Sequence, residues 1–271
     1  MSTDAAREVI VLGARPVPPL GGRPLPLVRI GSILAVLAVW ELVTHSGRVP
    51  TVFLPTPMTV ARELARMVVT GELWRSLAPS LARIVSGFAI GGASGFVVGV
   101  LAGVSSWAEA IADPLISATY PVPKIALLPL LILWLGIGEP SKIAVIAIGS
   151  FFPVAIGTMS AVREVDPLLI RAARSLGATR AQIVLKVRIP ASLPAIFASL
   201  RLAAGMALLL VVSAEMIAAT AGIGYLILYA GDLLQTARLL AGIIVLSILG
   251  VLSTAALQAV ERRLLRGRSQ G

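Results

Sequence analysis

The sequence has no cysteine and a single histidine, His45, among its 271 residues. Disulfides, thiolate metal sites and cysteine nucleophiles are therefore excluded, and one histidine cannot build a histidine metal cluster. Acidic residues are also scarce, because 13 Asp and Glu stand against 23 Lys and Arg. An intramembrane hydrolase would need a nucleophile with a base, paired acids or metal ligands at membrane depth, and we find no such group. We predict that the chain is not an enzyme and that it holds no metal and no cofactor.

Charged residues of either sign make up only 13% of the sequence, whereas 57% is hydrophobic. This balance lies outside the range of soluble domains and predicts a protein that crosses the lipid bilayer several times. The net charge of +10 could favour nucleic acid. The basic residues lie between apolar segments, however, and form no patch with exposed aromatic residues. We therefore predict no contact with nucleic acid.

The apolar segments predict an all-α membrane protein with six transmembrane helices. The six segments are residues 27–44, 81–104, 115–138, 141–162, 195–220 and 238–260. We expect a single transmembrane domain over residues 27–265, between a disordered tail (residues 1–26) and a short second tail (residues 266–271). Residues 56–69 have apolar positions at helical spacing opposite charged ones, which predicts a helix at the membrane surface.

Basic residues are concentrated in the two tails and in the loop of residues 163–194. An even number of spans places both tails on one side, together with the loop between the fourth and fifth spans. Loops rich in Lys and Arg stay in the cytosol. The sequence therefore predicts that both termini and this basic loop are cytosolic.

Glycine recurs at every fourth position of the second predicted span. The five residues are Gly87, Gly91, Gly95, Gly99 and Gly103. A row of small residues on one helix face lets another helix approach closely within a membrane. We predict that this face packs against a neighbouring helix.

The third predicted span is interrupted by Pro121, Pro123 and Pro129. Proline removes a backbone donor, and a broken helix is tolerated in a membrane only against protein or a water-filled cavity. Pro121 and Pro123 are therefore candidates for a substrate pathway. Lys124 lies in the break, where it could attract an anionic substrate or extend toward the interface instead.

Two further ionisable residues lie within predicted spans. Glu215 is deep in the fifth span, and we include it among the pathway candidates. A structural hydrogen bond to a neighbouring helix or to a base within the membrane is the alternative for Glu215. Arg201 lies close to the start of the same span, where an interfacial position is the simpler interpretation.

The basic loop has the signals of two short helices around a turn. Asp166 and Pro167 predict a helix start, and Gly177 predicts a left-handed cap at its end. Thr179 and Gln182 have capping-box spacing for a second helix. Pro190 and Pro194 are expected to end that helix. We expect Leu168, Leu169, Ala172, Ala173 and Leu176 to share one face of the first helix.

The stretch RAARSLGATRAQIVLKVRIPASLP resembles the EAA loop in the membrane subunits of binding-protein-dependent ABC importers. This resemblance implies the type I ABC importer permease fold, with a coupling-helix loop between helices 4 and 5 that docks on a cytosolic ATPase. Ala172 and Ala173 match the two alanines of the motif, and Arg171 stands where the family often has glutamate. The resemblance places ATPase coupling on Arg171, Ala172, Ala173, Arg174, Ser175, Leu176, Gly177 and Ala178.

The resemblance extends over residues 53–266 and is similar to the nitrate, sulfonate and taurine branch, through LPTPMTV, PVPKIALLPLLILWLGIGEPSK and SAEMIAATAGIGYLI. It implies import of a small anionic solute across a bacterial inner membrane. The same architecture could serve riboflavin, a thiamine-precursor pyrimidine or bicarbonate.

The resemblance also implies several partners: two ATPase subunits that bind ATP and magnesium, a second copy of this chain and an extracytoplasmic solute-binding protein. The sequence has no GxxxxGK[ST] motif, so ATP hydrolysis is expected on a separate subunit. A secondary transporter working alone would need inverted repeats with corresponding broken helices. We find one break without a counterpart.

Overall fold

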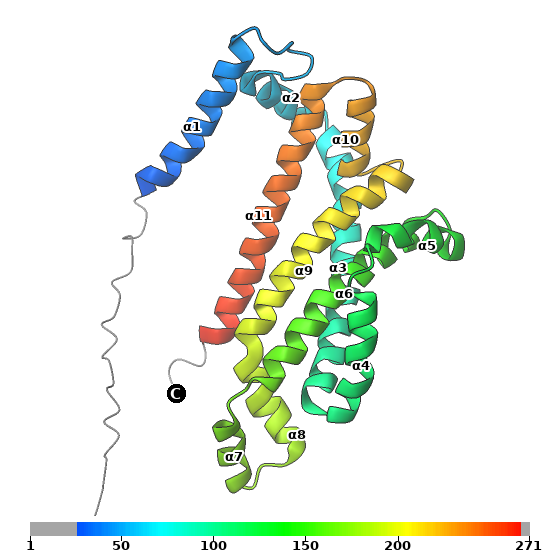
Figure 1. Ribbon diagram of the computed structural model, residues 1–271. Helices are drawn as coiled ribbons and strands as arrows, with labels where there is room; N and C mark the ends of the chain where they lie inside the picture. Colours follow the sequence, from blue (N-terminus) through cyan, green and yellow to red (C-terminus); the bar gives the residue numbers. More distant parts are fainter. Residues whose placement is uncertain (1–25, 267–271) are drawn as a thin grey trace, which may run out of the picture. The chain divides into compact units, whose positions relative to one another are not determined.

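The computed structural model describes residues 26–266, and this part of the chain is nearly all helical, without strands (Figure 1). Both predicted tails lie outside the described residues, except that Pro26 begins α1 and Arg266 ends α11. The chain divides into two compact units between residues 50 and 51. Each unit is described by itself.

The first unit contains α1 (Pro26–His45), which covers the first predicted span. Its exposed apolar residues lie all around the helix, as expected for a segment surrounded by lipid. The apolar part, Ile30–His45, is shorter than the spans of the second unit. The Nδ1 atom of His45 lies 3.0 Å from the carbonyl oxygen of Glu41, at the end of the helix.

The second unit contains four helices that are long and apolar enough to cross a membrane, within the described part of the chain. They confirm as helices four of the predicted spans: α3 (Glu72–Val104), α6 (Glu139–Arg163), a continuous helix ending with α9 (Arg180–Ala218) and α11 (Thr236–Arg266). Shorter helices flank them: α2 (Pro57–Val69), α7 (Pro167–Ser175) and α10 (Ile223–Asp232).

The remaining predicted span, residues 115–138, differs from the structure. Helix α4 (Ser106–Thr119) already begins at residue 106, because the hydroxyl of Ser105 accepts the amide of Ala108 and caps the helix. After a break at residues 120–123, a short 3-10 turn, η1 (Lys124–Leu127), leads into α5 (Leu128–Leu135). The two halves meet at 89°.

Pro129 does not interrupt the third span as predicted. It lies in the first turn of α5, where a helix requires no amide donor from that residue. Only the prolines at residues 121 and 123 fall in the break itself.

The glycine face of α3 packs on α6, as predicted. A Cβ atom on Gly91 would overlap the carbonyl oxygen of Ala147 in α6. A Cβ atom on Gly95 would lie 2.6 Å from the carbonyl oxygen of Phe151. Because the obstacle is backbone in both cases, no larger residue fits without separating the two helices.

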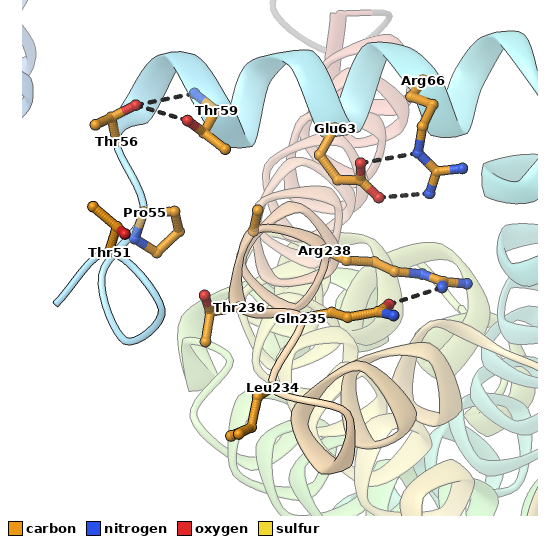
Figure 2. A pocket seen from close by; sticks show the side chains of 11 residues that line it. Thr51, Pro55, Thr56, Thr59, Glu63, Arg66, Leu234, Gln235, Thr236 and Arg238 are labelled. Carbon is orange, nitrogen blue, oxygen red and sulfur yellow. Dashed lines mark hydrogen bonds and ion pairs between the residues drawn. The ribbon is translucent and has the colours of Figure 1, made fainter.

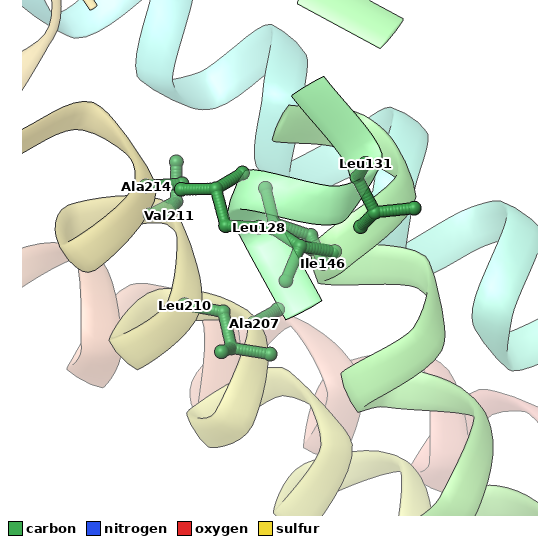
Figure 3. Packing of buried hydrophobic residues seen from close by; sticks show 8 residues of the cluster. Leu128, Leu131, Ile146, Ala207, Leu210, Val211 and Ala214 are labelled. Carbon is green, nitrogen blue, oxygen red and sulfur yellow. The ribbon is translucent and has the colours of Figure 1, made fainter. Parts of the chain in front are cut away.

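A buried apolar cluster joins α5, α6 and α9 (Figure 3). It consists of Leu128, Leu131, Val145, Ile146, Ala207, Leu210, Val211 and Ala214. This cluster fixes the bent half α5 against the two long spans, so the break is held in place by packing on both of its neighbours.

The prediction that Pro190 and Pro194 end the second helix of the basic loop is wrong. Helix α8 (Arg180–Ile183) continues through a π-helical turn, η2 (Val184–Arg188), directly into α9 (Ile189–Ala218). The amide of Ile189 donates to the carbonyl of Val184, five residues earlier. This wider turn gives the ring of Pro190 the room that a regular α-helix would deny it.

Candidate functional site

The turn between α7 and α8 is built as its sequence predicts. The carboxylate of Asp166 accepts the amide of Leu168 at 2.7 Å and caps α7. Gly177 has φ +80°, the left-handed conformation expected of a helix cap. The side chains and amides of Thr179 and Gln182 form a reciprocal capping box. These local bonds hold α7, the glycine turn and α8 as one unit.

The two sides of α7 differ. Its inner side presents Ile170, which packs with Val165 and Ile183 in a small buried cluster. Ala173 and Ala178 pack against this cluster, whereas Ala172 is exposed. The expectation that Ala172 and Ala173 share one face is therefore wrong, because consecutive helical residues point about 100° apart.

The outer side of α7 carries exposed apolar residues. Leu168 is 61% exposed, and Leu176, at the end of the helix, is 88% exposed. Leu169 and Arg171 are also exposed. Leucine side chains are costly to leave in water, so this side has the properties of a surface that another protein covers.

A cavity of about 950 Å³ lies between α6, α9 and the break at residues 120–123. Pro121, Pro123 and Lys124 line it from the break. The hydroxyl-bearing residues Ser160 and Ser199 line it from α6 and α9. The broken helix therefore borders a cavity, which is the situation in which a membrane tolerates such a break.

Lys124 is buried at the wall of this cavity. Its Nζ donates three hydrogen bonds to backbone carbonyls: to Thr119 at 2.7 Å, Tyr120 at 3.0 Å and Val122 at 2.8 Å. An ammonium group has three donors, so all of them are used. Its Nζ also lies 4.1 Å from the ring centre of Phe152. Lys124 thus satisfies the carbonyls that the break releases and leaves its positive charge beside the cavity.

Lys142 makes the same kind of contact at the next connection. Its Nζ donates to the carbonyls of Ile137 at 3.0 Å and Gly138 at 2.9 Å, between α5 and α6. The break before η1 and the connection after α5 therefore each have a lysine from the following helical segment that caps their carbonyls.

Glu215 does not line the cavity. It is fully buried, and its carboxylate accepts from Ser80 Oγ at 2.7 Å, Arg83 Nη1 at 2.8 Å and the amide of Gly224 at 2.8 Å. This arrangement matches the alternative predicted for Glu215, a structural hydrogen bond to a neighbouring helix or to a base within the membrane. Arg83 also donates to both carboxylate oxygens of Glu139, each at 2.6 Å.

Arg201 forms an ion pair with Glu261, which links α9 to α11. Within the described residues, no group of three His, Cys, Asp or Glu could hold a metal ion.

A polar cavity of about 680 Å³ lies between α2 and the turn from α10 to α11 (Figure 2). Glu63 and Arg66 on one wall form hydrogen bonds of 2.9 and 2.6 Å. The hydrogen bond from Arg66 holds the pKa of Glu63 below its ordinary value. On the other wall, Leu234 has φ +56°, and no other non-glycine residue in the described chain has a positive φ.

Comparison with known proteins decides the family. Residues 95–266 match the family model described as the binding-protein-dependent transport system inner membrane component. The chain belongs to this family of importer permeases.

Several relatives of the permease are named for their substrates. A putative aliphatic sulfonates transport permease of Bacillus subtilis (strain 168) is 38% identical over 86% of this chain and 85% of its own. The taurine transport system permease protein of Escherichia coli (strain K12) is 40% identical over 87% of each chain. A solved inward-facing structure of the MetNI methionine ABC transporter has a TM-score of 0.61 and 27% identity, covering 71% of this chain and 95% of that one.

The permease is thus a multi-pass membrane component of an ABC importer with the type I fold, as the resemblance implied. Arg83 is not among the site residues predicted from the sequence. The available signal was a charged residue within the otherwise apolar, glycine-rich segment of α3. A charge at such a position is costly unless it is paired, and Glu215 is the acid buried deepest among the spans.

Proposed function

We propose that two copies of this permease enclose a pathway that moves a small sulfonate, such as taurine, into the cell. ATP hydrolysis on two separate cytosolic subunits drives the movement, and those subunits bind the ATP and magnesium. The observation that carries this proposal is the exposed apolar side of α7 beside a rigid glycine turn. The permease sequence itself contains no GxxxxGK[ST] motif.

Docking of the ATPase on α7 follows from the exposure of its leucines. Leu168 and Leu176 would be buried in a groove of the ATPase, and apolar burial is the main driving force for such contacts. Leu176 adjoins Gly177, whose turn is fixed by caps on both helices. A movement of the ATPase groove would therefore reach α8 and, through the continuous π-helical turn, the pathway helix α9.

The pathway itself is proposed to need a second copy. The cavity between α6 and α9 is bordered by Leu202 and Leu209, which are 68% and 67% exposed. Exposed leucines at the edge of a cavity that contains polar residues are expected where another copy of the chain covers the surface. A homodimer would then enclose the solute between two equivalent cavities.

An anionic solute fits the positive charge of the cavity wall at the break, although Glu164 adds one carboxylate to the lining. Lys124 supplies a positive charge and Ser160 a hydroxyl donor, whereas the hydroxyl of Ser199 already donates to the carbonyl of Ile196. Because carbonyl groups occupy all three ammonium donors, Lys124 would attract the solute through its field rather than by direct contact. The names of both relatives favour sulfonates over a vitamin precursor or bicarbonate.

The orientation in the inner membrane follows from the charges. We place both termini and the turn between α7 and α8 in the cytosol, because basic residues concentrate there. The polar cavity between α2 and the turn from α10 to α11 would then face outward. A solute-binding protein would deliver the sulfonate at this end.

The test is ATP hydrolysis by the permease reconstituted in vesicles with its ATPase and its solute-binding protein. Taurine should stimulate hydrolysis only when the binding protein is present. The variant Leu176→Asp should abolish co-purification of the ATPase, whereas Leu233→Asp, an exposed leucine after α10, should retain it. Stimulation without the binding protein, or unchanged co-purification of Leu176→Asp, would contradict the proposal.

A further inference from the structure

A second, smaller cavity lies on the inner side of α7, away from Leu168 and Leu176. Its volume is about 350 Å³. It is lined by four aliphatic residues, one other small residue and three arginines: Val104, Ile170, Ile183, Val184, Ala181, Arg174, Arg180 and Arg188. Arg174 comes from α7, whereas Arg180 and Arg188 come from α8 and the π-helical turn. The three side chains therefore reach one cavity from two separate helical segments.

None of these arginines is neutralised within residues 26–266. The ion pairs of the described chain all involve other basic residues. Arg188 donates one hydrogen bond, from Nη1 to the carbonyl of Gly103 at 3.1 Å. A guanidinium carries five N–H donors, so Arg188 keeps further donors for a ligand. Three positive charges around one cavity repel each other, and a bound anion would offset that repulsion.

The cavity lies where membrane spans end. Val104 is the last residue of α3, and Arg180 begins the continuous helix that contains α9. Arg163, the last residue of α6, ends its span a few residues before α7. Aliphatic residues and arginines therefore meet at the level where the bilayer gives way to water, on the side of the membrane that carries α7. That combination matches a ligand with one anionic end and one apolar end.

We propose that this cavity binds a phosphate group, carried by the headgroup of an anionic phospholipid. Arginine is suited to phosphate because its planar group donates paired hydrogen bonds to the oxygens. Basic pockets between transmembrane helices bind such headgroups on the cytosolic side. The aliphatic lining favours a lipid over free phosphate, because Val104 and Ile183 offer a surface to the glycerol and the upper acyl chains.

The bound headgroup would stabilise α7 from its inner side. Ile170, Ala173 and Arg174 lie at positions i, i+3 and i+4, so they share the face that looks toward the cavity. Leu168 and Leu176 remain exposed on the other side. The lipid and the proposed ATPase contact therefore use different faces of α7, and the lipid site does not depend on the proposed substrate.

Lipid binding to the purified, full-length permease tests the proposal. The probes are phosphatidylglycerol, phosphatidylcholine and inorganic phosphate, each titrated while retained adducts are counted by native mass spectrometry. We expect one phosphatidylglycerol per chain to bind more tightly than phosphatidylcholine. Each of Arg174→Gln and Arg180→Gln should weaken phosphatidylglycerol binding about fivefold, which corresponds to about 1 kcal/mol for each arginine.

Arg171→Gln is the matched control, because Arg171 is an exposed arginine of the same helix that does not line the cavity. Its binding should equal that of the unmodified permease. Equal binding of the two lipids, absence of a retained lipid, or an equal loss in Arg171→Gln would overturn the proposal. If inorganic phosphate alone binds and displaces the lipid, the phosphate chemistry stands but the lipid source is wrong. Unchanged thermal unfolding of the variants shows that the loss is local.

Discussion

The Nη1 atom of Arg83 lies 2.8 Å from Oε1 of Glu215, and both side chains are buried. Glu215 at the end of α9 also accepts from Ser80 of α3 and from the amide of Gly224. Arg83 reaches onward to Glu139 at the start of α6. Arg83 and its two carboxylate partners thus join three spans at the end that is remote from α7.

Removing both members of this pair should cost less than the two single removals added together. Arg83→Met leaves the Glu215 carboxylate buried without its cation, and we expect the free energy of unfolding to fall by about 3–5 kcal/mol. In Arg83→Met/Glu215→Met the loss should be smaller than the sum of the single losses. Titration of the purified permease with a denaturing detergent, followed by tryptophan fluorescence, measures these differences.

Arg66→Met is the control for this cycle, because its pair with Glu63 is partly exposed. Its cost should stay below about 1 kcal/mol. Additive effects of Arg83→Met and Glu215→Met would show that the two side chains do not interact.

Neighbouring glycines of α3 should respond differently to the same substitution. In Gly91→Ala the new Cβ meets the backbone oxygen of Ala147, and we expect a loss of about 1–3 kcal/mol from overpacking. In Gly92→Ala the nearest atom is Cδ2 of Leu200 at 3.8 Å, an ordinary contact. That variant should be neutral or more stable by up to about 1 kcal/mol, because alanine favours a helix. The same detergent titration compares the two, and equal losses would disprove the close contact of α3 with α6.

Substitution of two lysines distinguishes the capping of carbonyl groups from the attraction of the solute. Lys124→Met and Lys142→Met each leave buried carbonyls without a donor, so each should lose about 1–3 kcal/mol of stability. Only Lys124 lines the cavity between α6 and α9. Transport assays in vesicles should therefore show a higher KM for taurine in Lys124→Met and an unchanged KM in Lys142→Met. A raised KM in both variants would mean that loss of the caps, rather than the charge, is responsible.

The glycine turn after α7 should couple ATP hydrolysis to transport. Gly177 has φ +80°, and Gly136, after α5, has φ +81°. A Cβ atom meets nothing within 4 Å at either position, so a valine at each acts through backbone strain, about 1–2 kcal/mol or more, and not through a clash. Gly177→Val should keep ATP hydrolysis but lose transport in reconstituted vesicles, whereas Gly136→Val should keep the ratio of the two. Coupled transport in Gly177→Val would exclude α7 as the coupling helix.

A fall in pH should weaken the ion pair of Glu63 and Arg66 in the wall of the polar cavity. The pKa of Glu63 is lowered from its ordinary value of 4.5, mainly by the hydrogen bond from Arg66. A lowered pKa means that the pair stabilises the fold above pH 4.5 and that this contribution is lost as the pH falls through the folded-state pKa. For a partly exposed pair of this spacing the contribution is about 0.2–0.5 kcal/mol. Unfolding titrations of Glu63→Gln and the unmodified permease should differ at pH 7 and converge in acid. A difference that persists in acid would assign it to something other than charge.

Local features of the fold could be predicted from the sequence. The caps of α7 and α8 depend on residues two or three positions apart, such as Asp166 with Leu168 and Thr179 with Gln182. The glycine face of α3 follows from helical spacing alone. Pro190 was misjudged because a π-helical turn upstream removes the clash that a regular helix would impose.

The partners of the buried charges could not be predicted in the same way. Arg83 and Glu215 are 132 residues apart, and no spacing rule connects them. The partners of Lys124 could not be predicted either, although they lie within five residues of it along the chain. Its position in the proline break indicated a charge near a pathway, but the carbonyls that occupy its ammonium group depend on how the chain turns at residues 120–123.

By itself, the sequence determined that this is an all-helical membrane protein with a capped, basic helical loop, because apolar length, helical spacing and capping are local properties of the chain. Only the tertiary structure decided which groups the membrane charges meet. Burial makes an unpaired charge costly, so Glu215 and Lys124 have the partners that helix packing brings within hydrogen-bond distance. The same packing placed Ala173 inward and Leu176 outward on α7, and it gathered three arginines around one cavity.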